Sequence, residues 1–358
     1  MLKKQKYVTA VFCLFLSFFF AAMGILQYQM IRGKKPVSTD AGIEAMNNDT
    51  VLVGGMPIGI YMETDGVMVL NTEQIAGADG KEHEPAKGIV KAGDYIMAVD
   101  HCEITGKKEL LEAVGNLTGT FVVLTVRRNG ETIDLKIKPV EYRLGIWVRD
   151  NVQGLGTVTF LTDQSRFGAL GHGIHDVDTS VLMSIAEGNV YRTSIRDITK
   201  GQSGSPGSME GMIIYNNYNI LGTIDKNTEA GIYGKIDKID ELFTEQTAIR
   251  TAKKEEIITG PATIRCFVDN EVREFDIEVT QVDMMSQEIN KGLVIKVTDE
   301  ELLEKTGGII QGMSGSPIIQ NGKLIGAVTH VFVQDSTKGY GIFIENMLKQ
   351  VNLPEMCG

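Results

Sequence analysis

The segment that most constrains this chain is the glycine-rich turn from Gly312 to Pro317, which reads Gly-Met-Ser-Gly-Ser-Pro. A serine in such a turn is poorly shielded, and the glycines let neighbouring backbone N–H groups converge on one point. Acyl transfer needs a nucleophilic hydroxyl and preorganised donors for an oxyanion. The apolar segment 318–328 follows at once, and its central Asn-Gly pair is typical of a tight turn between strands. Ser314 is therefore the candidate nucleophile, on a β-rich framework.

A serine becomes a good nucleophile when a histidine accepts its proton, and the chain has five histidines. His172 stands between two glycines after an apolar stretch, so its imidazole has room to reach across a cleft. It is the first candidate for the base, against the alternative of a histidine that only caps a turn. His175 is the second candidate. His330 lies in the apolar segment 327–333, and we expect it in the core.

A second segment repeats the nucleophile motif. Residues 201–206 read Gly-Gln-Ser-Gly-Ser-Pro, so Ser203 competes with Ser314 as a motif match. Further loop-like residues, 207–211, follow it, whereas an apolar hairpin pattern follows Ser314. Ser203 also comes soon after His172, which leaves little chain for a second folded half between base and nucleophile. We predict that Ser203 is not the nucleophile.

Composition sets the class of protein. A chain of 358 residues with 43% apolar and 23% charged residues is expected to form two or three globular domains. The 40 glycines against 8 prolines indicate a mainly β protein with many tight turns. A net charge of −11 without a long basic block argues against a nucleic-acid partner. The cysteines show no metal-ligand spacing, and the histidines form no His-Glu-x-x-His pattern. His172 and His175 could be read as metal ligands three residues apart, but their flanking glycines suit a loop better than a helix, so we expect no metal and no cofactor.

The N-terminus predicts a membrane anchor. An uncharged apolar run from Val8 to Leu26 follows three lysines, and it is about long enough to cross a bilayer as a helix. The positive-inside rule places the short N-terminal stub in the cytoplasm. Residues 1–32 are therefore read as stub and signal anchor, and the polar residues 33–50 as a linker. A cleaved signal peptide is the alternative.

Residues 51–140 resemble a PDZ domain of the kind found in bacterial proteases. The stretch 88–114, GIVKAGDYIMAVDHCEITGKKELLEAV, carries part of this resemblance. The other part is a segment that resembles the glycine-rich peptide-binding loop of PDZ domains, and it consists of Gly55, Met56, Pro57, Ile58, Gly59 and Ile60. In that family, loop amides hold a peptide carboxylate while the peptide adds a strand to the sheet. A plain turn is the alternative interpretation of this segment.

Two longer stretches resemble the stage IV sporulation protein B serine peptidase family of endospore-forming bacteria. They are 167–179, FGALGHGIHDVDT, and 297–345, which contains VTDEELLEKTGG and the motif of Ser314. The resemblance implies a membrane segment, a PDZ domain and a chymotrypsin-like double β-barrel peptidase domain, here residues 141–358. By position, it implies that His172 is the general base, Asp299 the acid and Ser314 the nucleophile.

Two parts of this assignment depend on analogy. The oxyanion hole of paired-barrel peptidases implies the backbone N–H groups of Gly312 and Ser314. The sequence itself does not single out Asp299 as the acid from three other aspartates, Asp225, Asp276 and Asp283. Asp299 also precedes a helical pattern and could simply be an N-cap.

The resemblance also implies a function. It is that of a membrane-anchored, self-cleaving serine endopeptidase of the forespore intermembrane space, where it cuts a regulatory membrane protein and so triggers sigma-factor activation. The PDZ domain would bind peptide segments of the enzyme itself or of its substrate. The alternative is a non-catalytic PDZ adaptor, which the presence of both His172 and Ser314 disfavours. An esterase is disfavoured because no Gly-x-Ser-x-Gly nucleophile elbow occurs.

Overall fold

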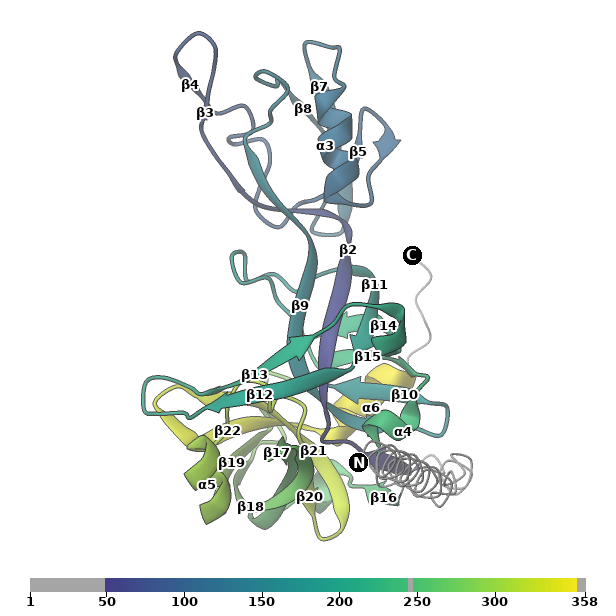
Figure 1. Ribbon diagram of the computed structural model, residues 1–358, viewed down its shortest axis with the longest axis vertical. Coiled ribbons are helices and arrows are strands. Elements are labelled where there is room, and N and C mark those ends of the chain that lie inside the picture. Colours follow the sequence, from purple (N-terminus) through teal and green to yellow (C-terminus); the bar gives the residue numbers. More distant parts are fainter. Residues whose placement is uncertain (1–48, 244–246, 353–358) are drawn as a thin grey trace, which may run out of the picture. The chain divides into compact units, whose positions relative to one another are not determined.

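The structure is a computed structural model, and it describes residues 49–243 and 247–352 (Figure 1). β-Strands make up most of its regular structure, as the composition predicted. The predicted membrane segment and linker residues 33–48 lie outside the described residues. Within the described ranges, no helix combines the length and the apolar character needed to cross a membrane.

Six antiparallel strands close into a first barrel. In the order of pairing around the barrel they are β2 (Pro57–Thr72), β9 (Ile146–Leu161), β10 (Arg166–Ala169), β15 (Gly231–Ile236), β14 (Ile220–Thr228) and β11 (Ile185–Tyr191), which pairs again with β2. Their inward side chains form one apolar core that includes Ile58, Phe167 and Val190. Closing the sheet in this way removes its exposed edges.

A second barrel has the same number of strands. They are β17 (Gly260–Val268), β18 (Glu271–Val282), β19 (Leu293–Val297), β22 (Asp335–Phe343), β21 (Lys323–Phe332) and β20 (Pro317–Gln320), which pairs with β17. Alternate residues of β17 and β18 point inward, and Ile264, Val279 and Ile295 are fully buried in its core. The hairpin that the Asn-Gly pair predicted is the turn between β20 and β21.

The two barrels are joined by strands and by a shared apolar cluster. β1 (Thr50–Val53) pairs with β9 and with β16 (Ala248–Thr251), and β16 runs parallel to β21. Phe160 and Tyr233 of the first barrel belong to one cluster with Ile342 of the second barrel and Met347 of helix α6 (Ile344–Asn352). The predicted double-barrel architecture is confirmed for this part of the chain.

A smaller β-rich module lies between the two halves of the first barrel in sequence. It uses the second half of β2 and the beginning of β9, together with β3 (Ile75–Ala76), β4 (Glu82–His83), β5 (Tyr95–Val99), β6 (Cys102–Glu103), helix α3 (Lys107–Gly115), β7 (Val122–Arg128) and β8 (Glu131–Ile137). Val67, Ile96, Leu110 and Leu124 belong to its separate core. β2 and β9 are therefore shared between module and barrel, and they run side by side (Figure 1).

The segment predicted to be a peptide-binding loop, Gly55 to Ile60, belongs to the first barrel. The Gly55 amide donates to the carbonyl of Val158, and Val158 donates to the carbonyl of Met56. From Pro57 onward the segment is strand β2, and Ile58 is fully buried. The assignment of Gly55, Met56, Pro57, Ile58, Gly59 and Ile60 to a carboxylate-binding loop is corrected accordingly, because their backbone already bonds within the barrel.

The remaining elements decorate the barrels. A two-stranded ribbon is formed by β12 (Thr193–Thr199) and β13 (Ser208–Ile213), and the repeated motif 201–206 is its connection. The 3-10 helices η1 (Asn217–Asn219) and η2 (Lys254–Glu256) and the short helix α4 (Ile239–Leu242) follow the ribbon in sequence. Helix α5 (Glu300–Thr306) lies between β19 and the nucleophile motif in sequence.

The module contains an ion pair whose two ends differ in exposure. The Asp94 side chain is 1% exposed, and both its oxygens accept from Arg128, at 2.7 and 2.6 Å. Arg128→Ala leaves this carboxylate buried without its cation, and we expect a loss of about 3 kcal/mol in the free energy of unfolding. The control is Arg143→Ala, which breaks an exposed pair with Glu141 and should cost less than about 1 kcal/mol. Equal urea midpoints for the two variants would contradict the prediction.

Candidate active site

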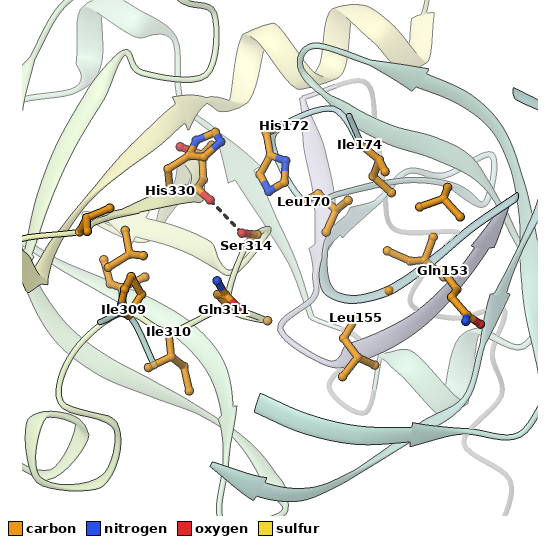
Figure 2. A pocket seen from close by; sticks show the side chains of 18 residues that line it. Gln153, Leu155, Leu170, His172, Ile174, Ile309, Ile310, Gln311, Ser314 and His330 are labelled. Atoms are coloured by element: carbon orange, nitrogen blue, oxygen red, sulfur yellow. Dashed lines mark hydrogen bonds between the residues drawn. The ribbon is translucent and has the colours of Figure 1, made fainter. Parts of the chain in front are cut away.

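One cavity of about 430 Å³ collects residues from both barrels (Figure 2). Leu155, Leu170 and His172 reach it from the first barrel and its connections, and Ser314 and His330 reach it from the second. The motif serine and the candidate base are thus brought to one place from distant parts of the sequence. The rest of the lining is mostly apolar.

Strand β9 holds the turn that carries Ser314. The Thr157 amide donates to the carbonyl of Ser314 at 2.9 Å, and the Thr157 hydroxyl donates to the carbonyl of Gly312 at 2.7 Å. Two residues further along the same face, the Thr159 hydroxyl donates to the carbonyl of Gly315 at 2.8 Å. Three hydrogen bonds from strand β9 of the first barrel therefore fix the nucleophile turn of the second barrel.

Gly315 allows this close contact between the barrels. Its φ is +96°, in the region that favours glycine, and a Cβ at this position would lie 2.0 Å from the carbonyl oxygen of Thr157. The amide of Gly315 donates instead to Val328 at 2.8 Å. The glycine of the motif is thus needed where the turn meets β9.

His172 follows β10 after a sharp change of chain direction. Leu170 and Gly171 have φ angles of +68° and +71°, and they turn the chain so that the imidazole enters the cavity. The next turn is fixed by Asn227, whose side chain accepts from the amide of Ile174 and donates to its carbonyl, each at 2.9 Å. The chain is therefore fixed both before and after the base, by the turn at Leu170 and Gly171 and by the side chain of Asn227.

The imidazole of His172 is oriented by a backbone carbonyl. Nδ1 lies 2.9 Å from the carbonyl oxygen of Gly173, so Nδ1 carries the proton and Nε2 keeps its lone pair. Burial lowers the pKa of His172 below its ordinary 6.5, against a smaller upward effect of the Gly173 bond. A neutral imidazole with a free Nε2 is the form that a general base needs.

Ser314 is at rest in this conformation. Its hydroxyl donates to the carbonyl oxygen of Thr329 at 2.8 Å, which is the dashed line in Figure 2. Attack on a substrate needs a rotation of this side chain so that its proton faces Nε2 of His172. This is a rotation about the Cα–Cβ bond of Ser314 from one staggered conformation to another, and the backbone turn that β9 fixes need not move.

His330 is not a core residue, contrary to the expectation from its apolar segment. Part of its surface is exposed to solvent, and its ring lies against that of His172, with 4.7 Å between the centroids. Partial burial, with the neighbouring His172 and Lys291 as further causes, lowers the pKa of His330 to about 4. A neutral ring therefore covers one side of the base and keeps a further positive charge away from it.

Asp299 lies at the start of α5 and is not among the residues that line the cavity. Its carboxylate accepts from the amide of Leu302 at 2.9 Å and from that of Asp276 at 3.3 Å. This is the N-cap geometry that the sequence left open as an alternative. The structure therefore brings His172 and Ser314 together but leaves Asp299 elsewhere, and its role as the acid stays a prediction from the resemblance.

The two amides predicted for the oxyanion hole are free to bind a ligand. Within the described part of the chain, neither the N–H of Gly312 nor that of Ser314 donates to another protein atom. Both residues line the cavity. Gly312 has a φ of +101°, which a residue with a side chain rarely adopts.

The other candidates take structural positions. Ser203 is exposed, and its hydroxyl donates to the carbonyl of Gln334 at 2.9 Å, outside the cavity. His175 bonds Glu229 at 3.2 Å. Across residues 49–243 and 247–352, no group of three or more His, Cys, Asp or Glu side chains is placed to hold a metal ion.

Sequence reasoning did not find the residues that position this site. Thr157 and Thr159 alternate with apolar residues in the last six residues of β9, which are all buried, and a buried hydroxyl needs a partner. That pattern is the one signal that could have marked them. Asn227 and Thr329 give no comparable signal, because their partners are backbone groups far away in sequence.

Solved proteases show low similarity to the chain. An HtrA-type protease, AlgW with a decapeptide, is 12% identical, with 56% of this chain and 52% of that chain covered and a TM-score of 0.32. The Rv3671c protease from M. tuberculosis in its active form is also 12% identical, with 58% and 78% covered and a TM-score of 0.30. The chain thus spans about half the length of the AlgW chain.

The family of the chain follows from its own sequence. No curated protein matches it. The family described as SpoIVB peptidase S55, however, matches residues 140–348, which is more than half of the chain. The match contains the nucleophile motif, the candidate base and most of both barrels. The chain therefore belongs to the SpoIVB peptidase S55 family.

Proposed function

We propose that the chain cleaves peptide bonds with Ser314 as the nucleophile and His172 as the general base. The observation that carries the proposal is that the two residues line one cavity from different barrels, with the serine turn fixed by β9. The amides of Gly312 and Ser314 are the proposed oxyanion hole. Together these groups supply the nucleophile, base and oxyanion donors that acyl transfer requires.

The proposed reaction proceeds in two stages. Nε2 of His172 takes the proton of Ser314 as its oxygen attacks the peptide carbonyl, and the amides of Gly312 and Ser314 stabilise the oxyanion. The protonated imidazole then gives its proton to the leaving amine, and an acyl-enzyme remains. Water, activated by the same imidazole, hydrolyses the ester and restores Ser314. The Gly173 carbonyl stabilises the imidazolium through Nδ1–H in both stages.

The cavity supports a proposal about the substrate. Apolar side chains surround the nucleophile, and they include Leu155, Leu170, Ile310, Val331 and Val333. Such a lining favours an apolar residue directly before the cleaved bond, because a charged side chain there would lose its hydration without gaining a partner.

The cellular setting is proposed from the sequence and the family. The apolar run Val8–Leu26 supports a membrane anchor with the catalytic region outside the cytoplasm. The sporulation family supports a role in the forespore intermembrane space, where the enzyme would cut a regulatory membrane protein and lead to sigma-factor activation. Self-cleavage beyond the anchor would release the catalytic region. The module between β2 and β9 would bind peptide segments as PDZ domains do.

The nucleophile is tested by a covalent label. Ser314→Ala should abolish reaction with a fluorophosphonate probe and reduce peptide cleavage by at least about 10³-fold, because the attacking oxygen is lost. Ser203→Ala is the matched control from the repeated motif, and it should keep both activities. Labelling is measured by mass spectrometry of the purified chain. If the Ser314→Ala chain is still labelled, Ser314 is not the nucleophile.

The pH dependence tests the base. Burial lowers the pKa of His172 below 6.5, so the neutral, working form persists as the pH falls through 6.5. We therefore expect the acid limb of kcat/KM to lie below pH 6.5. An acid limb at or above about pH 7 would indicate that a carboxylate contacts the imidazole in the working enzyme. Asp299→Asn would then identify the carboxylate, because asparagine keeps the helix cap and loses the charge.

Substrate preference tests the apolar lining. In a peptide series that varies only the residue before the cleaved bond, leucine or methionine should give a kcat/KM about 10- to 100-fold above that of aspartate or lysine. The measurement is the initial rate of cleavage at low substrate concentration. Equal rates for the charged and apolar peptides would contradict this role of the cavity.

A further inference from the structure

The repeated motif at 201–206 has a structural position that its sequence does not explain. It forms the tip of the β12–β13 ribbon, and this tip packs against the second barrel beside the cavity. The amide of Gly201 donates to the carbonyl of Thr306, and the amide of Gly204 donates to that of Val333. With the Ser203 bond to Gln334, these contacts attach the tip to chain segments that come before and after the nucleophile turn in sequence.

The ribbon bonds directly to the nucleophile turn at one residue. The amide of Gln311 donates to the carbonyl of Gly207, and the carbonyl of Gln311 accepts from the amide of Met209, each at 2.8 Å. This exchange is a short parallel bridge between the ribbon and the residue that precedes Gly312. The side chain of Met209 also packs where Gly312 lacks one.

The bridge determines where the Gly312 amide points. In a trans peptide, the carbonyl of one residue and the N–H of the next point in opposite directions, and the described chain has no cis peptide bond. The carbonyl of Gln311 points to Met209, so the N–H of Gly312 points away from the ribbon. Gly312 lines the cavity and Met209 does not, so this N–H faces the site.

We infer that the segment Gly207–Met209 of the β12–β13 ribbon is the positioning element of the oxyanion hole: the Met209 N–H and the Gly207 carbonyl hold the Gln311–Gly312 peptide in the orientation that transition-state binding needs. The segment that directly follows the repeated motif thus contributes to the reaction, and the motif itself supplies neither the nucleophile nor the bridge. If the bridge is lost, the peptide is free to turn its N–H out of the cavity. The inference rests on the proposed function of Ser314 and its neighbouring amides.

Gly207→Ala tests the bridging segment. A Cβ at this position would lie 2.2 Å from the carbonyl oxygen of Thr199 and 2.8 Å from Ile310 Cγ2, so Gly207 must move relative to the nucleophile turn. We expect kcat to fall by roughly 10- to 100-fold with KM unchanged. Affinity for a peptide aldehyde, which forms an oxyanion with Ser314, should fall by the same factor. The acid limb of the pH profile should not move, because the base is untouched.

Gly204→Asn is the matched control, at the tip of the same ribbon. Gly204 has a φ of +83° with open space around it, and asparagine tolerates that conformation. This variant should keep the kcat and the aldehyde affinity of the unaltered chain. A uniform loss in both variants, with KM and thermal stability also changed, would mean that the ribbon has only a structural role.

A single-atom change keeps the test independent of folding. The α-hydroxy analogue of methionine, incorporated at position 209, replaces the Ser208–Met209 amide by an ester. This change removes only the N–H that donates to the carbonyl of Gln311. We expect the same selective fall in kcat and aldehyde affinity. Unchanged values would overturn the inference, whereas an active Ser314→Ala chain would instead overturn the proposed function. The two failures are therefore distinguishable.

Discussion

The site depends on the contact between strand β9 and the turn that carries Ser314. The backbone and hydroxyl of Thr157 and the hydroxyl of Thr159 bond three carbonyls of that turn, and Gly315 lets the two backbones meet. The base comes from the chain that follows β10, the neighbour of β9 in the first barrel. One strand therefore connects the nucleophile with the barrel that supplies its partner. Hydrogen bonds of this kind, buried between two rigid barrels, position a reacting atom far better than a free loop could.

The residues around the base suit its role without a charged partner in the conformation described. A carbonyl holds Nδ1–H of His172, and a neutral His330 lies against the ring. Burial outweighs the upward effect of the Gly173 bond on the pKa of His172, so the imidazole stays uncharged and can accept the proton of Ser314. The resting bond of Ser314 to Thr329 fits the same condition, since the hydroxyl keeps its proton until a substrate arrives. The catalytic groups are thus placed but not yet engaged.

Local motifs could be predicted from the sequence, and non-local pairings could not. Ser314 and His172 were found because the chemistry of each lies within a few residues of glycine-rich chain. The segment from Gly55 to Ile60 was misassigned because a glycine-rich loop and a glycine-bearing buried strand look alike locally. Its partners in β9 and β11 come about 100 and 130 residues later, and only folding reveals them. Asp299 fits both a helix cap and a catalytic acid by pattern, so sequence alone could not separate the two.

The shared strands β2 and β9 have a consequence for how such a protein can evolve. Glu63 and Asn151 are paired neighbours where the small β-rich module begins and ends, and both strands continue into the barrel. A hairpin turn at that point would close the barrel with the path of every remaining strand unchanged. Recombination could therefore add, exchange or delete this insert in one step, and the hydrolytic machinery would be inherited intact.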